Sequence, residues 1–468
     1  MKKVIGILLL VVVLGAVAPF GFGFWADARL AELVAEANKS GVVDFTVIKT
    51  EKGWFSTQVV IEAEPAGKLS ESIRKAKISQ AANSKLILRG TLYHGPFPFA
   101  KGGISLMPVI GTMDSRFVKG VDSTEGIVNI DYSMKVIFAL TGNTNVKIDI
   151  PAWNGPLGKG DANLEWKGLR GDISFTKGMK SAKMDINAPY MKLVSKKGTL
   201  LMESFSIVSD SKEGIEGLSL GNANFKIGKI EFMEGASQSS FKMDSADMSV
   251  NTDASGDNVS MDMSLTVAKV IASGEQYGPF IFKFGLKNLD AGALARIRDK
   301  ANAARGGEIP PDQVKMMMAT TMLSEMSNLL SKGPVIEIPE LSLRSTVGNM
   351  TGSARLSVDT SKPALLANPF LMKNALVGEV DIEISENLMV AMALVSIRKE
   401  FKEANIKYTE DQLKTMAQSR VNKRMSGLVA ANMFIKDGDM YRFKAGIKDG
   451  IPMVNGKPFK MPGGGARH

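Results

Sequence analysis

The stretch that decides the fold is Met261-Asp262-Met263-Ser264-Leu265-Thr266-Val267, in which apolar and polar side chains alternate without a break. A period of two places every second side chain on the same face of a β-strand, so one face packs on apolar surface and the other meets water. The same alternation runs from Val128 to Phe138, and Gly with Asn, Asp or Ser punctuates the runs at 141–143 and 255–257. Regular amphipathic helices are not interleaved with these runs, so the pattern predicts an antiparallel sheet over residues 42–288.

Helical patterns enter the later chain as insertions. Residues 289–333 form a helical insertion, in which Asp290 caps a first helix and Pro310-Pro311 opens a second. Residues 334–461 mix strands with helices, carry the spacing of a capping box at Thr409–Gln412, and close in a hairpin at Asp449-Gly450. Residues 462–468 read as a disordered tail. The fold class is therefore mainly β with α (α+β): an elongated, curved antiparallel sheet with packed helices, behind an N-terminal transmembrane helix.

The transmembrane helix is expected from Val4 to Trp25, 22 uncharged residues preceded by Lys2 and Lys3. As a helix the segment would be about 33 Å long, close to the thickness of a bilayer's hydrocarbon core. Residues 1–25 are thus predicted to be a retained signal-anchor, and residues 26–41 a membrane-proximal helix that sets the height of the body above the membrane. The alternative is a cleaved signal peptide with its site at 16–18, which Pro19 at the first mature position disfavours.

Charge and composition bound the location and the partners. The excess of positive charge before the apolar segment predicts a cytoplasmic N-terminus, so the body would lie in the periplasm of a bacterium, attached by a single pass to the inner membrane. The chain contains no cysteine, and burial alone must then supply its stability. A formal net charge of +10 would attract anionic lipid or simply keep the body soluble. Nucleic acid is not an expected partner in that compartment.

Short motifs at both ends of the body carry a family resemblance. These are Gly53-Trp54-Phe55-Ser56, His94-Gly95-Pro96, Asp449-Gly450 and Asn455-Gly456-Lys457-Pro458. In this order and spacing, together with the anchor, the chain resembles the YdgA-like family of bacterial envelope proteins over nearly its whole length. The resemblance implies an inner-membrane anchor and a β-rich periplasmic body. It implies no established reaction and carries over no catalytic residue.

Motifs typical of enzymes do not find their context in this chain. Gly217-Leu218-Ser219-Leu220-Gly221 matches a nucleophile elbow, but its flanks read as strands where a strand–turn–helix is required, and a histidine base is lacking. Residues 155–160 are similar to a phosphate loop without the Ser/Thr that holds magnesium, and are predicted to be a plain loop. His94 is expected to orient a turn through a backbone hydrogen bond, because metal sites need several ligands. We therefore predict no enzyme, no cofactor and no metal.

Candidate contacts to an apolar ligand lie in two regions, one aromatic and one rich in methionine. They are Trp54, Phe55, Phe97, Phe99, Met318, Met322 and Met326. The aromatic residues would line the mouth of an apolar site or serve as ordinary packing. The methionine-dense helix would be a movable lid over a groove or a plain cover of the sheet. Basic residues between 399 and 424 would meet lipid phosphates or form a solvated face.

Two functions follow from these features. The first is a non-enzymatic envelope protein that binds lipid or another apolar molecule in a groove of the curved sheet. The alternative is a structural or assembly scaffold for envelope proteins, which would bind them, or another copy of itself, through an exposed edge or patch. A hydrolase that uses Ser219 or His94 is disfavoured by the missing triad context.

Overall fold

The computed structural model describes residues 2–39, 41, 43–67, 86–100, 103–104, 109–118, 133–156, 162–196, 198–235, 239–272, 274–305, 311–361, 372–404 and 406–459. Within these ranges the side chains of residues 2–17, of Phe99 and of several residues at segment ends are outside the description. The chain forms two compact units. Unit 1 comprises residues 1–213 and 301–314, and unit 2 comprises residues 214–300 and 315–468.

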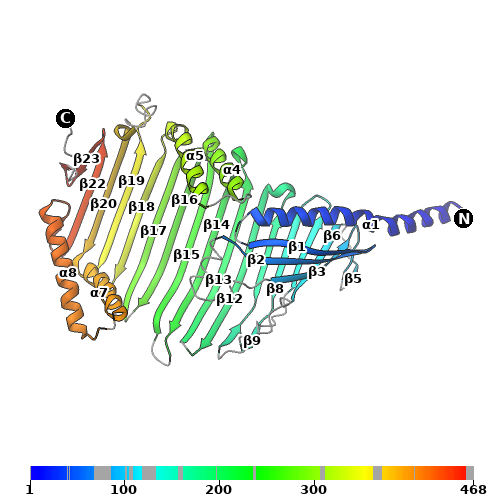
Figure 1. Ribbon diagram of the computed structural model, residues 1–468, viewed down its shortest axis with the longest axis horizontal. Coiled ribbons are helices and arrows are strands. Elements are labelled where there is room, and N and C mark those ends of the chain that lie inside the picture. Colours follow the sequence, from blue (N-terminus) through cyan, green and yellow to red (C-terminus); the bar gives the residue numbers. More distant parts are fainter. Residues whose placement is uncertain are drawn as a thin grey trace. The chain divides into compact units, whose positions relative to one another are not determined.

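Unit 1 is an antiparallel sheet with one long helix, α1 (Lys2–Lys39), lying along it (Figure 1). The strands that follow one another across this sheet are β1 (Val43–Lys52), β2 (Ser56–Pro65), β3 (Leu86–His94), β6 (Val109–Val118), β7 (Ser133–Ala139), β8 (Thr144–Ile150), β11 (Leu169–Phe175), β12 (Ser181–Ser195) and β13 (Gly198–Glu213). Short β9 (Trp153–Pro156) and β10 (Asn163–Trp166) pair with each other, and β10 also pairs with β12. Strands β4 (Phe99–Ala100) and β5 (Gly103–Ile104) form a separate ribbon.

The apolar face of unit 1 is closed by α1. Ala26 and Leu30 of the helix are buried against strand residues such as Leu92, Met113 and Phe138, which are themselves excluded from water. The helix predicted for residues 26–41 therefore exists as the continuation of the N-terminal helix, but it is not a free stalk. It packs along the sheet because Ala26, Leu30 and the half-buried Leu33 and Val34 present one apolar stripe at helical spacing.

Unit 2 is likewise built from antiparallel strands, with helices at its margins. Its strands in spatial order are β14 (Ser219–Met233), β15 (Ser239–Ser255), β16 (Asn258–Ala272), β17 (Glu275–Asp290), β18 (Val335–Ser345), β19 (Asn349–Val358), β20 (Leu376–Ser385), β22 (Met440–Lys448), β23 (Ile451–Val454) and β24 (Lys457–Pro458), with β21 (Ile435–Asp437) also on β22. Its helices are α4 (Ala291–Arg305), α5 (Pro311–Ser331), α7 (Glu386–Glu403) and α8 (Glu410–Ala430). Residues 301–305 of α4 and 311–314 of α5 are grouped with unit 1.

Local sequence signals account for these elements. The predicted capping box forms at the start of α8: Gln412 N donates to Thr409 Oγ1 at 3.3 Å and Thr409 N donates to Gln412 Oε1 at 2.9 Å. Asp290 accepts from Ala293 N at 2.7 Å and caps α4 as expected. The closing hairpin of β22 and β23 turns at Asp449-Gly450, both of which have positive φ. The antiparallel, mainly β fold with helices is thus confirmed, while the tail at 462–468 lies outside the described residues.

The predicted membrane span lies for the most part outside the described side chains, since these begin at residue 18. Within the portion that is described, no helix combines the length and the apolar character needed to span a membrane.

Two glycines of α1 give a matched test of its docking. A Cβ at Gly23 would lie 2.6 Å from the ring of His94, whereas a Cβ at Gly21 would meet nothing within 4 Å. We expect Gly23→Ala to lower the free energy of unfolding of unit 1 by about 1–3 kcal/mol, since helix or imidazole must shift. Gly21→Ala should instead be neutral or stabilising by up to about 1 kcal/mol, because alanine favours the helix. Urea unfolding followed by tryptophan fluorescence measures both, and equal effects of the two substitutions would contradict the docking.

Candidate functional site

One face of the unit 2 sheet is apolar across eight consecutive strands. The register aligns a single residue from each strand into a continuous row: Phe225, Met248, Leu265, Phe282, Leu341, Gly352, Ile382 and Phe443. Directly opposed side chains of an antiparallel pair have Cβ atoms about 5 Å apart, so neighbours in the row contact one another. The row is therefore one uninterrupted apolar band.

Two further rows flank this band on the same face. One joins Ile227, Ala246, Val267, Phe280, Leu343, Met350, Ile384 and Tyr441. The other joins Thr252, Met261, Leu286, Ile336, Leu356, Gly378 and Ile447. We call the surface made by these three rows the apolar face.

The opposite face of the same strands is charged. Cross-strand ion pairs join Lys283 to Glu340 (2.8 Å), Arg355 to Glu337 (2.7 Å), Lys226 to Asp247 (3.2 Å), Arg442 to Glu383 (3.0 Å) and Lys444 to Asp381 (3.4 Å). Pairs this exposed contribute little to stability, but they identify the side of the sheet that meets water. The strict alternation of the sequence has thus sorted the side chains of unit 2 into two unlike faces.

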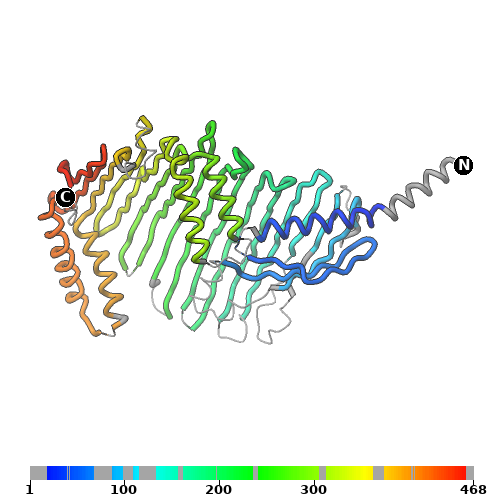
Figure 2. Tube along the Cα trace, turned by 45° about the horizontal axis from the view of Figure 1, so that its top comes forward, coloured from blue at the N-terminus to red at the C-terminus, as the bar shows by residue number. Residues whose placement is uncertain are grey.

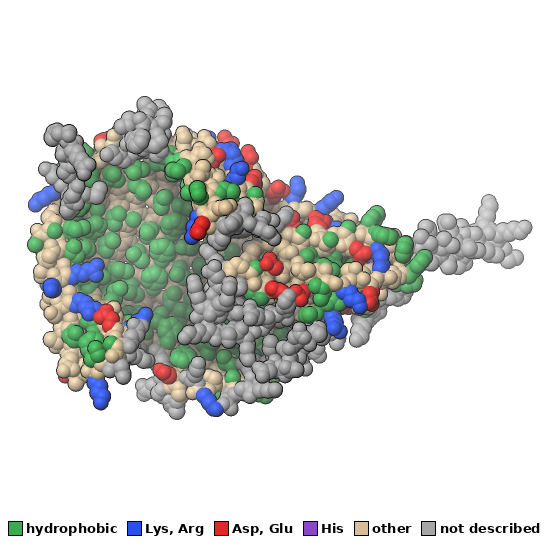
Figure 3. All heavy atoms as spheres, viewed as in Figure 1, with side chains coloured by type: hydrophobic (Ala, Val, Ile, Leu, Met, Phe, Trp, Pro, Cys, Tyr) green, Lys and Arg blue, Asp and Glu red, His purple; other side chains and the backbone are tan. Residues whose placement is uncertain are grey.

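In the part of the chain that the structure describes, the apolar face of unit 2 has no packed cover over its middle. Of the residues in the three rows, Tyr441 alone is buried, and the others are half-buried or exposed. Among the described residues, buried clusters of unit 2 lie at its margins: Leu220 and Val259 with Ala291 of α4, and Val421, Met425 and Tyr441 beside α7. Figure 3 shows the middle as a recessed surface of hydrophobic side chains over β15 to β20. This contrasts with unit 1, where α1 covers the corresponding apolar side chains.

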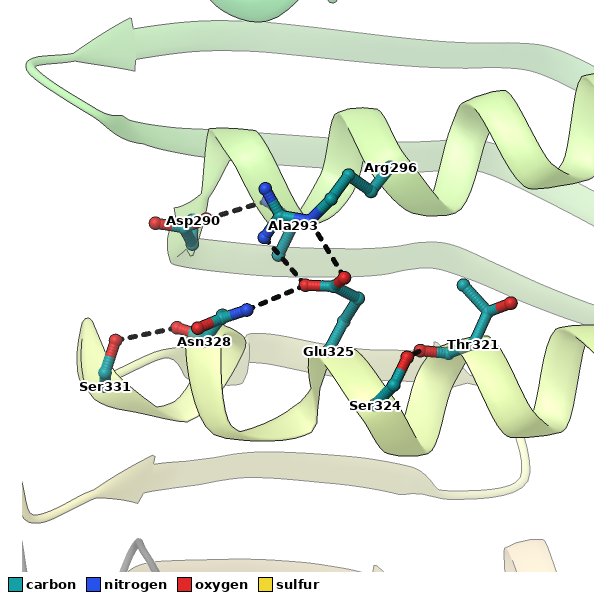
Figure 4. Close-up of polar contacts among 8 residues, drawn as sticks. All are labelled: Asp290, Ala293, Arg296, Thr321, Ser324, Glu325, Asn328 and Ser331. Carbon is teal, nitrogen blue, oxygen red and sulfur yellow. Dashed lines mark hydrogen bonds and ion pairs between the residues drawn. The ribbon is translucent and has the colours of Figure 1, made fainter.

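Helices α4 and α5 border the apolar face and lie side by side in both views (Figures 1 and 2). Arg296 of α4 joins them through a two-pronged ion pair, in which Nε donates to Glu325 Oε1 at 2.8 Å and Nη2 donates to Glu325 Oε2 at 2.7 Å (Figure 4). Asn328 adds a third hydrogen bond to Glu325 at 2.8 Å. Bidentate geometry of this kind fixes orientation as well as distance. We call this set the α4–α5 clamp.

The clamp lowers the pKa of its carboxylate. Hydrogen bonds from Arg296 and Asn328 lower the pKa of Glu325 to about 2 from an ordinary value of 4.5. Because the folded pKa is the lower one, the clamp contributes fully above pH 4.5 and is lost as the pH falls toward 2. Helix α5 is consequently held in place throughout the neutral and mildly acidic range.

The other border of the apolar face is the pair of helices α7 and α8. Between them and the ends of β16, β17 and β18 lies a cavity of about 1180 Å³, whose wall combines apolar Val390 and Leu394 with polar Arg398, Lys414 and Tyr277. Tyr277 is in register with Val270 of β16, so the cavity adjoins the strands that form the apolar face. Desolvation, followed by the charge of Glu275, raises the pKa of the Tyr277 phenol, which stays protonated at neutral pH. Two basic residues of these helices form ion pairs, Arg398 with Glu410 and Arg420 with Glu400. Lys414 and Lys423 line the cavity, as does Arg398.

A family model described as "Bacterial protein of unknown function (DUF945)" matches residues 1–462. The chain belongs to this family. Searches found no curated protein and no solved structure similar to this DUF945 chain.

The candidate contacts predicted from the sequence fall into separate units. Met318, Met322 and Met326 lie on α5, with Met322 exposed and the other two half-buried. Trp54, Phe55 and Phe97 belong to unit 1 and are each half exposed to solvent. The side chain of Phe99 lies outside the described residues. The methionines therefore belong to a helix that borders the apolar face of unit 2, whereas Trp54, Phe55 and Phe97 belong to unit 1.

The residues that sequence reasoning missed are the strand residues themselves. Phe280, Phe282 and Phe284 alternate along β17 in the same way as Met261 to Val267 along β16. Alternation in the sequence predicts strands with one apolar face, but it does not indicate which strand residues would form a ligand site. The signal that would have identified a site is the shortage of amphipathic helices able to cover so many strands.

His94 has the structural role that the sequence suggested. It is buried, its Nδ1 lies 3.3 Å from the Trp54 carbonyl oxygen, and its Nε2 lies 2.9 Å from the Thr57 hydroxyl. A carbonyl accepts only, so Nδ1 carries the proton and the neutral ring accepts from Thr57. Ser219 opens strand β14 rather than a helix, so it lacks the setting of a nucleophile elbow. No group of metal-ligating side chains occurs among the described residues.

The α4–α5 clamp predicts the behaviour of α5. Removing the negative charge in Glu325→Gln should make the amides of residues 315–330 exchange with solvent severalfold faster, because α5 loses its bidentate partner. Glu340→Gln, which breaks the Lys283 pair on the charged face, is the matched control and should leave α5 unchanged. Hydrogen exchange read by mass spectrometry distinguishes them, and unchanged protection of α5 in Glu325→Gln would disprove the clamp.

The burial of His94 predicts that the free energy of unfolding of unit 1 depends on pH. Desolvation by burial is the main cause that lowers the pKa of His94 below 6.5. Since the folded pKa is the depressed one, stability is full above the unfolded pKa and falls as the pH drops below it. The free energy of unfolding should therefore decrease between pH 7 and about 5.5, and His94→Gln should flatten this slope. Urea titrations at the two pH values provide the measurement, and an unchanged slope in the variant would assign the dependence to other groups.

Proposed function

We propose that this DUF945 protein is a non-enzymatic envelope protein that binds lipid acyl chains on the apolar face of unit 2. The observation that carries the proposal is the set of aligned apolar rows, over which the described residues form no packed cover. Seven strand spacings make the face about 34 Å wide, and the three rows extend it by about 20 Å along the strands. An area of about 700 Å² of contiguous apolar surface is larger than what a soluble monomer usually exposes without a function.

Several features favour a lipid over a rigid, specific ligand. The rows combine Phe, Met, Leu, Ile and Val with few polar groups, which suits long flexible chains and offers little orientation to a small polar molecule. Methionines at Met248, Met261 and Met350 add adaptable contacts. The adjoining cavity, with Lys414 and Arg398 in its wall, supplies polar surface next to the apolar one. An amphiphile needs that combination.

The proposal includes the setting of the protein. The uncharged run from Val4 to Trp25 behind Lys2 and Lys3 supports a single-pass anchor in the bacterial inner membrane, with the body in the periplasm. The order and spacing of the motifs at Trp54, His94 and Asn455 support placement within the YdgA-like group. A protein anchored in a membrane lies next to the lipid that we propose as its ligand.

Leu356 and Val377 provide a matched test, because they have equal exposure on opposite faces. Leu356 of β19 is 38% exposed within the apolar face, and Val377 of β20 is 39% exposed on the charged face. Leu356→Glu should lower the amount of co-purified phospholipid at least about tenfold, since a carboxylate would be desolvated under the acyl chain. Val377→Glu should leave it unchanged.

The measurement is native mass spectrometry of the full chain in mild detergent, with extraction and identification of bound lipid. Equal lipid content in both variants would refute binding at the apolar face. A wild-type protein free of lipid that instead gives discrete crosslinked products in cells would favour the scaffold function, with a protein partner covering the same face.

A further inference from the structure

Unit 1 carries an exposed aromatic cluster where α1 meets the turn between β1 and β2. Its members are Phe20, Phe24 and Trp25 on the helix and Trp54 and Phe55 at the turn. Phe97, which follows the end of β3 by three residues, is exposed to the same extent as Trp54 and Phe55. Single exposed hydrophobic residues need no explanation, but a group of large aromatic ones in contact does.

The helix and the turn form one continuous surface through ring contacts. Phe20 stacks on Trp54 with ring centroids 4.9 Å apart, and Phe20 meets Phe24 edge-on at 5.3 Å. Phe20 and Phe24 are four residues apart and share one side of α1. Lys52 Nζ lies 3.4 Å from the centroid of Phe24 and 2.7 Å from Asp27 Oδ2, which ties the end of β1 to the helix.

The turn is held rigidly from beneath. Gly53 N donates to the carbonyl oxygen of Ser56 at 2.8 Å, and His94 N donates to that of Phe55 at 2.8 Å. The buried His94 ring reaches the Trp54 carbonyl on the same side. Gly53 N and the carbonyl oxygens of Trp54, Phe55 and Ser56 are thus hydrogen-bonded within the protein. The Trp54 and Phe55 side chains nevertheless stay half exposed. Exposure of these apolar rings to water is unfavourable, and burial against a partner would remove that unfavourable free energy.

Charge in this region argues against a partner held by electrostatics. Lys52 is paired with Asp27, and Lys49 with Glu51 at 2.6 Å. The charges next to the turn therefore cancel in pairs, and aromatic rings are left as the outward feature. Rings with an apolar body and, in tryptophan, one polar N–H are the side chains that gather at the boundary between hydrocarbon and headgroups.

We propose that this aromatic cluster, together with Phe97, inserts into the interfacial layer of the membrane that holds the anchor and so fixes unit 1 to the membrane surface. We call this contact the seat. The inference rests on the proposed anchor, and continuity along the helix is its main support: the uncharged run ends at Trp25, and α1 already packs on unit 1 at Phe22 and Gly23, inside that run. The body thus begins within the last turn of the apolar run. Helix and turn enter the interface together, and the anchor cannot swivel freely against unit 1.

The absence of cysteine allows the seat to be mapped with single labels on the full-length chain. Phe55→Cys places an environment-sensitive fluorophore in the seat, and Phe97→Cys provides an independent second position. Val208→Cys is the control: Val208 is 47% exposed, against 50% for Phe55, and lies on β13 at the other end of the unit 1 strand order. Leu10→Cys reports on the apolar run itself. Each variant is reconstituted in vesicles of zwitterionic phosphatidylcholine, with spin-labelled lipid as quencher.

The expected result is a blue shift and loss of most emission at positions 55 and 97 with a shallow quencher, with no change at 208. High salt should not reverse it, because the charges near the turn are already paired. Quenching at position 10 by lipid labelled deep in its acyl chain, without shallow quenching at 55 or 97, would overturn the seat and leave the anchor standing. The absence of quenching at position 10 by that deep quencher would overturn the anchor, and the seat with it.

Discussion

Strand register is the constraint on which the rest of this structure depends. A slip of one residue in any hairpin of unit 2 would turn that strand's apolar side chains toward the charged face. The register instead carries Phe225 through to Phe443 in a single row, with Lys–Glu and Lys–Asp pairs on the reverse side. The charged pairs contribute little energy, but they make the wrong register costly, because a slipped strand would place carboxylates among phenylalanines.

The two units differ in how the apolar face of the sheet is covered. An antiparallel sheet with one apolar face must have that face covered. Unit 1 covers it from within the chain, where Ala26 and Leu30 of α1 exclude water from Leu92 and Phe138. In unit 2 the helices stand at the borders, and their buried side chains, such as Ala291 and Met425, serve the margins of the sheet. Among the described residues the middle has no such cover, and it is there that we propose a ligand binds.

Much of the fold could be predicted from the sequence because its signals are local. Alternation identified the strands, the Thr409–Gln412 box marked the start of α8, and Asp449-Gly450 marked the last turn. The site could not be predicted in the same way. Alternation reads identically for a covered and an uncovered face, and only spatial pairing shows that Leu265, Phe282 and Leu341 are neighbours. Trp54 and Phe55 drew notice as conspicuous aromatics, but their role depends on the stacking with Phe20, a residue that sequence analysis had assigned to the anchor.

The open middle of unit 2 also bears on how such a chain can change length. A closed core resists insertions, because any added side chain must find space among packed neighbours. The rows here are built by adjacent hairpins, each of which bonds only to the strands beside it. One more hairpin would lengthen every row by two side chains and widen the apolar face by about 10 Å, with no interior to repack. The width of the apolar face can therefore change by one hairpin at a time. Such changes would match the face to proposed ligands of different length.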